Sequence, residues 1–300
     1  MWQARHVAAR LEALDPNLEV ELTIIKTEGD LRSEAPFGAL LGKGFFVKEI
    51  ESALLSGEID LAVHSLKDLP SEFPDGLALA AVLERHDPRD AILSASGFTF
   101  DDLPQGTLVA TGSPRRRAQL LHARPDLRMG DIRGNVGTRI RKLREGRFGA
   151  LVLALAGVER LGIASVPVVP VAISVCLPAV GQGALAVETR EDDARTRAMV
   201  SSLTDAATLR AVTAERAFLA RLGGGCLAPA TAFARTVNGR IVMESVVGDA
   251  DGRRLLRDRI EGPAGNEVEM GEQLADRMLS SGARQILEAA RAASGEDAAR

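Results

Sequence analysis

A single cysteine, Cys226, directly follows Gly223, Gly224 and Gly225, and its thiol is the group in this sequence most suited to covalent chemistry. Residues 206–222 carry apolar residues at helical spacing, so Gly223 stands where a helix normally ends in a left-handed residue. Consecutive glycines also let a bound group come close to the backbone. A thiol in such a loop can act as a nucleophile or a covalent anchor, although a buried cysteine after a helix cap fits the same local sequence.

A lysine and an aspartate, Lys67 and Asp68, follow the apolar run 59–64, which predicts a strand. In open α/β sheets, ligands gather beyond the carboxyl ends of the strands, so this pair stands where chemistry is expected. Pro70 stiffens the chain just beyond it. A solvated surface turn that carries two charges explains the same residues, and the local sequence leaves both interpretations open.

Arginines mark two further turns from a predicted strand to a predicted helix. Arg115 and Arg116 follow the segment 111–114 at one helix start, and Arg133 and Arg139 flank the next. Free backbone N–H groups and the helix dipole attract anions at such starts. A guanidinium can also hold a carboxylate or a phosphate through two hydrogen bonds. Two similar clusters favour an anion-binding surface over a solvated basic face.

The basic residues are concentrated in one stretch of the chain. Between residues 113 and 147 there are eleven Arg and Lys residues against three acidic ones, a local charge of +8 in a chain of net charge −4, so the remainder carries −12. Nucleic acid fits this distribution poorly. The stretch contains no Phe, Tyr or Trp on which a base could stack, and the acidic remainder repels phosphates at long range. A small polycarboxylate suits the pattern better.

The sequence carries no convincing motif for a metal or a nucleotide. The four histidines and two cysteines lack zinc-ligand spacing. Segment 38–44 is one residue short of a phosphate-binding loop and lacks its Ser or Thr. We therefore expect no metal. There are only two cysteines, no apolar run of bilayer length and no export signal, so we expect a cytoplasmic protein without disulfides. We also expect it to be a monomer.

The elements that must position these residues follow from hydrophobic periodicity. In the first part of the chain, the pattern predicts a helix to about residue 15, strands at 19–25 and 59–64, a helix at 46–56 and an extended stretch at 77–83. In the second part, it predicts strands at 107–110, 127–132 and 150–154, with helices at 115–123 and 136–145. Both parts alternate strand and helix, which is typical of parallel sheets.

The last third of the chain has a different pattern. A helix at 206–222 is followed by strands at 231–236, 240–247 and 253–260, with hairpin signals at Asn238–Gly239 and Asp251–Gly252, and by helices at 266–280 and 283–293. Segment 84–90 and segment 177–183 are expected to cross between the first two parts. We therefore predict an α/β protein with domain 1 at 1–84 and 184–202, domain 2 at 89–178 and an α+β domain 3 at 205–300. A cleft between the first two domains is the expected ligand site.

Five segments, in order along the chain, closely resemble the porphobilinogen deaminase family. They are Gly-Lys-Gly-Phe-Phe-Val-Lys-Glu at 42–49, His-Ser-Leu-Lys-Asp-Leu-Pro at 64–70, Arg-Gly-Asn-Val-Gly-Thr-Arg at 133–139, Leu-Pro-Ala-Val-Gly-Gln-Gly at 177–183 and Arg-Leu-Gly-Gly-Gly-Cys at 221–226. The resemblance implies two α/β domains similar to periplasmic binding proteins, plus a third domain. It also implies the stepwise condensation of four porphobilinogen molecules, with loss of ammonia, and hydrolytic release of the linear tetrapyrrole, hydroxymethylbilane.

The same resemblance implies roles for individual residues. A dipyrromethane cofactor would be joined to Cys226 by a thioether, and Asp68, with Lys67 beside it, would be catalytic. The expected cofactor-binding residues are Lys43, Ser65, Lys67, Asp68, Thr111, Ser113, Arg115 and Arg116. The expected contacts to incoming porphobilinogen and the growing oligopyrrole are Arg133, Arg139, Arg160 and Gln182. Each pyrrole carries two carboxylates, which accounts for many arginines in one cleft.

Two features depart from the family. Its members carry a strand and a Gly-Thr-Arg-x-Ser-x-Leu-Ala segment ahead of the Trp-Gln that stands here as Trp2–Gln3, and that segment supplies an arginine and a serine of the active site. From the sequence as it stands, we expect domain 1 to lack its first strand and turnover to be weak or absent. The second departure is Gly112, where the family usually has a hydroxyl, and we expect it to cost a single hydrogen bond.

Two other functions remain to be distinguished. A two-domain solute-binding or effector-sensing protein for a small polycarboxylate uses a similar fold without chemistry. It predicts no covalent adduct and gives neither the third domain nor Cys226 a role. A nucleic-acid-binding protein would use the arginine-rich stretch, and its binding would depend steeply on salt.

Overall fold

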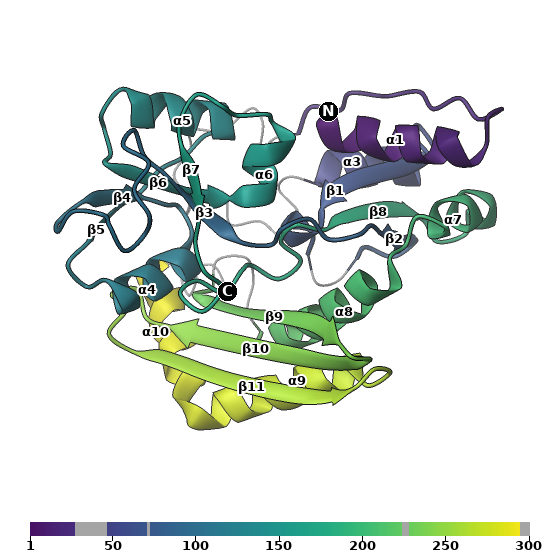
Figure 1. Ribbon diagram of the computed structural model, residues 1–300. Helices are drawn as coiled ribbons and strands as arrows, with labels where there is room; N and C mark the ends of the chain where they lie inside the picture. Colours follow the sequence, from purple (N-terminus) through teal and green to yellow (C-terminus); the bar gives the residue numbers. More distant parts are fainter. Residues whose placement is uncertain (28–46, 71–72, 224–227, 295–300) are drawn as a thin grey trace.

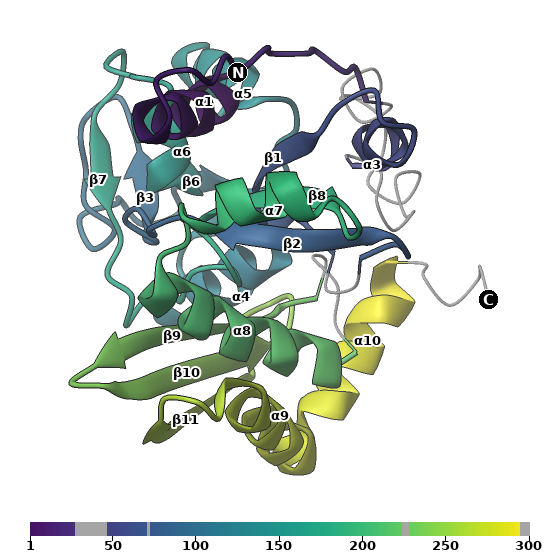
Figure 2. The same ribbon diagram turned by 90° about the vertical axis from the view of Figure 1, so that its right-hand side faces the viewer.

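The computed structural model describes residues 1–27, 47–70, 73–223 and 228–294, which form three β-sheets flanked by helices (Figures 1 and 2). The mixed α/β class predicted from the sequence is confirmed. Lys43 and Cys226 lie outside the described residues. Within the described parts, no helix is both long enough and apolar enough to span a bilayer.

The first sheet has the order β1-β8-β2 and consists of β1 (Leu61–Ser65), β8 (Leu185–Arg190) and β2 (Leu77–Val82). Its helices are α1 (Trp2–Leu14), α3 (Lys48–Leu55) and α7 (Ala194–Ser201). Residues Val7 and Leu11 of α1 are buried in one core with Leu185 and Val187 of β8. The predicted return of the chain after segment 177–183 is therefore confirmed, because β8 becomes the middle strand.

The predicted parallel arrangement of this first sheet is wrong. Strand β8 runs antiparallel to both of its neighbours. The reason is topological: the chain re-enters this sheet from the second sheet in the opposite direction. Periodicity within a strand reports which faces are buried but carries no information on which distant strand will lie beside it.

The strand predicted at 19–25 is also wrong. The described residues that follow Asp15, up to Thr27, contain neither helix nor strand. The alternation of Val20, Leu22 and Ile24 is typical of a strand, but backbone becomes a strand only when a neighbour accepts its hydrogen bonds. This segment pairs with none of the described strands, and Ile24 is 70% exposed.

The second sheet has five strands in the order β5-β4-β6-β3-β7. These are β3 (Asp90–Leu93), β4 (Leu108–Ala110), β5 (Arg128–Gly130), β6 (Ala150–Ala154) and β7 (Val168–Pro170), with helices α4 (Pro114–Ala123), α5 (Val136–Arg144) and α6 (Leu155–Arg160). The predicted parallel pairing holds for β4 with β5 and with β6. Strands β3 and β7 were not predicted, and β3 pairs antiparallel with both β6 and β7.

The third sheet is an antiparallel meander, as predicted. It has the order β11-β10-β9 and comprises β9 (Ala230–Val237), β10 (Arg240–Gly248) and β11 (Leu255–Pro263). Helices α8 (Ala206–Arg221), α9 (Glu267–Met278) and α10 (Arg284–Ser294) pack against it, with a π-helical turn at Leu279–Ala283 before α10. Asn238 and Gly239 both have positive φ (50° and 75°), as their hairpin requires.

One buried carboxylate joins the third sheet to the two crossings between the first two. Glu215 of α8 is fully buried and accepts two hydrogen bonds from Arg85, at 2.8 and 2.9 Å. It also accepts from the backbone N–H of Gly181 and of Ala234, both at 2.8 Å. Because Arg85 lies on the first crossing and Gly181 on the second, a single side chain of α8 fixes both.

Candidate functional site

The end of β1 presents the predicted catalytic pair. The chain leaves the strand in a short 3-10 turn at Leu66–Asp68, in which Leu66 is buried and Asp68 is exposed. The adjacent Lys67 lies among Asp68, Asp90, Arg115 and Arg116. Burial lowers the pKa of Lys67, the two arginines lower it further, and the two carboxylates oppose them. The predicted pair therefore meets the predicted arginines across the two sheets.

Helix α4 begins beside this pair. Ser113 is its N-cap, and its hydroxyl accepts a hydrogen bond from the backbone N–H of Arg116 at 3.5 Å. The hydroxyl of Thr111, which is buried, accepts from the backbone N–H of Ser113 at 3.2 Å. A Cβ at Gly112 would lie 2.9 Å from the carbonyl oxygen of Ile132. Glycine therefore fits this close approach, and a hydroxyl residue would require the backbone to shift.

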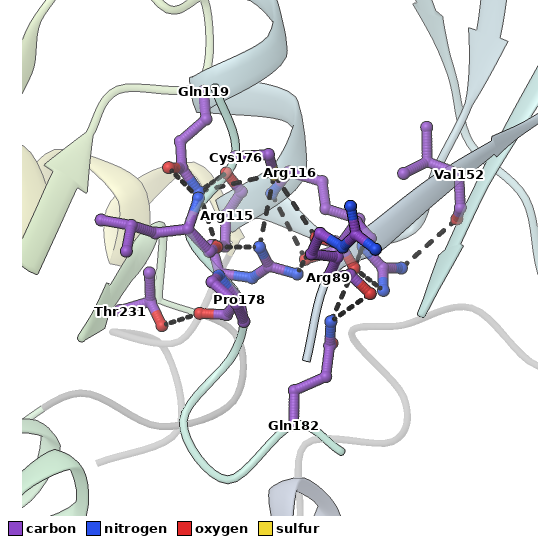
Figure 3. A network of polar contacts seen from close by, with 12 residues as sticks. Arg89, Arg115, Arg116, Gln119, Val152, Cys176, Pro178, Gln182 and Thr231 are labelled. Atoms are coloured by element: carbon purple, nitrogen blue, oxygen red, sulfur yellow. Dashed lines mark hydrogen bonds and ion pairs between the residues drawn. The ribbon is translucent and has the colours of Figure 1, made fainter. Parts of the chain in front are cut away.

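Arg115 and Arg116, which are labelled in Figure 3, both bind Asp90, a fully buried carboxylate at the start of β3. Arg115 Nη2 donates to Asp90 Oδ2 at 2.8 Å, while Arg116 donates to Oδ1 through Nε at 3.0 Å and through Nη2 at 2.8 Å. Their charges and hydrogen bonds outweigh the cost of burial and hold the pKa of Asp90 well below its usual range. Asp90 is therefore ionised, and two cations share one anion.

The same network extends into the second crossing. Gln182 donates to Asp90 Oδ1 at 2.9 Å and to the carbonyl of Pro88 at 2.7 Å. Arg115 donates to the carbonyl of Leu177, and its Nη1 lies 3.4 Å from the sulfur of Cys176. Burial, and then Asp90, raise the pKa of Cys176 to about 12. This thiol therefore stays protonated and packs as part of the network.

Helix α5 carries the second group of predicted arginines. Its N-cap Asn135 accepts from the backbone N–H of Thr138 at 2.9 Å, and Gly134 before it has a φ of 102°. Arg139 Nε donates to the carbonyl of Gly134 at 2.7 Å. Burial and the neighbouring Arg116 lower the pKa of Arg139, whereas Asp68 opposes them. Arg133 contributes its carbonyl, which accepts from Lys142 Nζ at 3.2 Å.

Arg160 and Ser65 connect this region to the first helix. Arg160 Nη2 donates to the carbonyl of Gly183 at 2.6 Å, and its guanidinium lies 5.6 Å from the centre of the Trp2 ring. Gln3 Nε2 donates to the hydroxyl of Ser65 at 2.7 Å. The amino-terminal end of α1 therefore contacts both the end of β1 and the glycine turn that follows Gln182.

The structure thus brings several predicted site residues into electrostatic contact. Asp68 acts on both Lys67 and Arg139, and Arg115 and Arg116 act on Lys67. Sequence reasoning missed Asp90, because segment 84–90 was interpreted only as a crossing. A usable signal existed: an aspartate that directly precedes the apolar run 91–93 is placed to be buried and then needs cationic partners.

The arrangement suits a ligand that carries several carboxylates. Among the described residues of this cluster, the cations Lys67, Arg115, Arg116 and Arg139 outnumber the carboxylates that act on them, Asp68 and Asp90. A dipyrromethane group carries carboxylates on both rings, and the cationic donors present fit it. Asp68 remains exposed and able to reach a ligand. Among the described residues, no group of three or more His, Cys, Asp or Glu side chains could hold a metal ion.

Two family models match the chain. Residues 1–198 match the porphobilinogen deaminase dipyromethane cofactor binding domain, and residues 209–280 match the porphobilinogen deaminase C-terminal domain. The chain is 46% identical over 288 residues to the porphobilinogen deaminase of Syntrophus aciditrophicus, covering 96% of this chain and 94% of that protein. It is 48% identical over 288 residues to the porphobilinogen deaminase of Trichlorobacter lovleyi, covering 96% of this chain and 92% of that protein.

Solved structures show weaker likenesses. The periplasmic VFT2 domain of Bordetella pertussis BvgS aligns with a TM-score of 0.40 at 15% identity, over 67% of this chain and 76% of that chain. An ancestral cationic amino acid solute binding protein also aligns with a TM-score of 0.40, at 16% identity, over 67% and 77%. These scores are too low to support a conclusion, whereas the two family models and the relatives near 50% identity agree over almost the whole chain. This chain therefore belongs to the porphobilinogen deaminase family, whose members are transferases with a dipyrromethane cofactor.

Proposed function

We propose that the residues around Asp68 carry out the family's reaction in this chain. Four porphobilinogen molecules are joined head to tail, each with loss of ammonia, onto a dipyrromethane primer on Cys226, and water then releases hydroxymethylbilane. The observation that carries the proposal is the meeting of Asp68 and Lys67 with Arg115, Arg116 and Arg139, from both sheets, in one cluster. The cofactor would supply the free pyrrole position to which the first unit is attached, and each later unit would be attached to the unit before it.

Asp68 is the proposed catalytic residue. Loss of ammonia from porphobilinogen leaves a cation on the substrate, and a nearby carboxylate can stabilise it and move protons at the pyrrole nitrogens. Asp68 is exposed at the end of β1, and its charge acts on both Lys67 and Arg139. We propose that Lys67 steadies this carboxylate and binds a cofactor carboxylate.

The remaining predicted residues are proposed to hold carboxylates. The cofactor side of the cleft comprises Lys43, Ser65, Lys67, Thr111, Ser113, Arg115 and Arg116, and the substrate side comprises Arg133, Arg139, Arg160 and Gln182. Support comes from the excess of cations in the cluster and from Ser113 and Asn135, which cap the two arginine-bearing helices. Gln182 and the two arginines of α4 also bind Asp90. We propose that they contact the ligand while they keep these hydrogen bonds to Asp90.

We also propose three domains: domain 1 at 1–84 and 184–202, domain 2 at 89–178 and domain 3 at 205–300. The assignment of strands to three separate sheets supports them. A monomeric, cytoplasmic enzyme without a nucleic-acid partner is likewise proposed, on the two cysteines and on the mismatch between the charge pattern and nucleic acid.

The mass of the intact protein tests the cofactor. We expect an excess equal to two linked pyrrole units, and we expect Cys226→Ser to lose it. Cys176→Ser is the matched control and keeps the excess, because the Cys176 thiol is buried and protonated. An unmodified mass in active protein would contradict the proposal and favour a solute-binding protein.

The turnover of Asp68→Asn tests the catalytic residue. We expect this variant to release little product, since the neutral amide cannot stabilise the developing cation. Asp131→Asn is the control: that carboxylate is 87% exposed, and we expect the same turnover as in the unsubstituted chain. Near-normal turnover of Asp68→Asn would remove Asp68 from the mechanism.

A further inference from the structure

A cavity lies between helix α1 and the first crossing, and its lining residues differ from the site residues named above. It encloses about 330 Å³ and is lined by His6, Arg10, Leu83, Glu84, Arg85, His86 and Leu185. Helix α1 forms one wall, the crossing 83–86 forms another, and β8 closes it. In Figure 2, α1 lies above the strands β8 and β2 in this part of the molecule.

The polar groups that line the cavity are mostly cationic or able to become so. Arg10 and Arg85 are guanidinium groups, and His6 and His86 are imidazoles. Among the described residues that line the cavity, Glu84 is the one carboxylate. Glu215 lies behind Arg85 and accepts from both of its terminal nitrogens, yet the buried Nε of Arg85 has no hydrogen-bond partner among the described residues. A buried N–H donor without a partner is costly, and an added acceptor removes that cost.

The two imidazoles form a ring cluster with Trp2. His6 stacks on Trp2 with ring centres 4.9 Å apart, and His86 meets both rings edge-on at 6.1 and 6.3 Å. Burial lowers the pKa of His6, and His86, Arg10 and Arg160 lower it further. Burial and then Arg160 lower the pKa of His86, while Glu159 and Glu84 act in the opposite direction. Burial first, and then the neighbouring positive charges, therefore resist protonation of the two imidazoles.

We propose that this cavity binds a small oxyanion, a carboxylate or a tetrahedral anion such as sulfate or phosphate, between α1 and the first crossing. Arg10 supplies the charge, and the N–H groups of His6, His86 and Arg85 supply donors. An anion here also offsets the repulsion that opposes protonation of the imidazoles. By linkage, the bound anion raises both histidine pKa values, so binding strengthens as the pH falls from 7.5 to 6. This goes beyond the proposed function and does not depend on it.

The histidine resonances of the full-length protein test the proposal. The chain has four histidines, so each ring proton can be assigned with single His→Gln variants. Sulfate is the first probe, because its charge does not change between pH 6 and 7.5, and acetate is the second, to separate tetrahedral anions from carboxylates. We expect saturable shifts at His6 and His86. His64, buried beside Glu188, and His122, bonded to the carbonyl of Gly252, serve as internal references that do not move.

Matched arginine variants localise the binding. We expect Arg10→Gln to weaken sulfate binding at least about fivefold, as loss of one charge-assisted contact implies. Arg5→Gln, on the same helix but outside the cavity lining, leaves the affinity unchanged. We expect Arg139→Gln, a variant in the Asp68 cluster, also to leave the shifts of His6 and His86 unchanged. That result would show that sulfate binds in this cavity and not at the Asp68 cluster.

The pH dependence is the last requirement. We expect the affinity for sulfate to rise at least about threefold between pH 7.5 and pH 6, and to become nearly independent of pH in the double variant His6→Gln, His86→Gln. Equal shifts at all four histidines, equal affinities of the Arg10→Gln and Arg5→Gln variants, or no saturable shift would each overturn the proposal. None of these readouts depends on turnover.

Discussion

Helices α4 and α5 begin in the same way but use their arginines differently. Each follows a strand of the second sheet, and each is capped by a polar side chain, Ser113 or Asn135. In α4, Arg115 and Arg116 are buried against the carboxylate of Asp90. In α5, Arg139 bonds the carbonyl of its own preceding turn and is only partly buried.

The difference teaches that one buried anion decides how a basic helix start is used. Asp90 ties α4 to β3 and, through Gln182, to the second crossing. The arginine side chains of α4 are therefore held in place before any ligand arrives. Among the described carboxylates, Arg139 of α5 has no buried anchor of this kind, and the ion pair of Arg141 with Glu145 on the same helix is exposed. Arginines held by a buried carboxylate suit a permanently bound cofactor. An arginine without such a partner suits the proposed substrate chain, which changes in length.

Replacing Asp90 should have the largest effect, because Asp90 is what distinguishes α4 from α5. We expect Asp90→Asn to destabilise the protein by about 3–5 kcal/mol, because it leaves two buried guanidinium groups without their shared anion. The urea midpoint of unfolding measures this effect. Asp131→Asn, at an exposed carboxylate 4.0 Å from Arg117, is the control and should leave the midpoint unchanged. Equal midpoints for both variants would show that Asp90 is not an anchor.

The pH dependence of stability sharpens the same point. The pKa of Asp90 is lower in the folded protein than in the unfolded chain. Its ionised carboxylate therefore contributes fully to the free energy of unfolding above the unfolded-state pKa near 4, and this contribution is lost as the pH falls towards the folded-state pKa. The stability difference between the wild type and Asp90→Asn should therefore be constant above about pH 5. Below about pH 4 it should shrink by about 1.4 kcal/mol per pH unit. Urea unfolding at pH 3 to 7 measures it, and a constant difference down to pH 3 would contradict the assignment.

The arginines themselves should separate into two classes. We expect Arg116→Gln to lower stability by about 2–3 kcal/mol, since it removes charged hydrogen bonds to Asp90. We expect Arg139→Gln to lower kcat/KM by about ten- to a hundredfold with an unchanged urea midpoint, because we propose that its charge binds a carboxylate of the ligand. Steady-state kinetics and urea unfolding of both variants measure these effects. If both variants lost stability and kcat/KM to the same extent, the proposed difference between Arg116 and Arg139 would be wrong.

Two glycines provide the smallest test. A Cβ at Gly112 would lie 2.9 Å from the carbonyl of Ile132, whereas a Cβ at Gly137 meets only the side-chain oxygen of Asn135 at 3.5 Å. We expect Gly112→Ala to destabilise by about 1–3 kcal/mol, the range for overpacking, and Gly137→Ala to stabilise by about 0.5–1 kcal/mol through helix propensity. Urea midpoints that move in the same direction for both variants would contradict this account of the two helix starts.

Local features were determined by the sequence itself. The end of α1 before Pro16, the left-handed Gly223 after α8 and the Asn238–Gly239 hairpin all follow from short-range sterics and capping, and the structure has each of them. The Lys67–Asp68 turn was likewise found from a strand end and an apolar run. Such features depend on residues close in the chain, so a few neighbours suffice to predict them.

Only the tertiary structure decided which distant groups meet. No local pattern indicates that β8 separates β1 from β2, or that segment 19–25 lacks a strand partner among the described residues. Nor does one indicate that Asp90 neutralises part of the charge of Arg115 and Arg116, which lie 25 and 26 residues further along the chain. Strand pairing and buried ion pairs are settled by which surfaces pack together, and that information is spread over the whole chain.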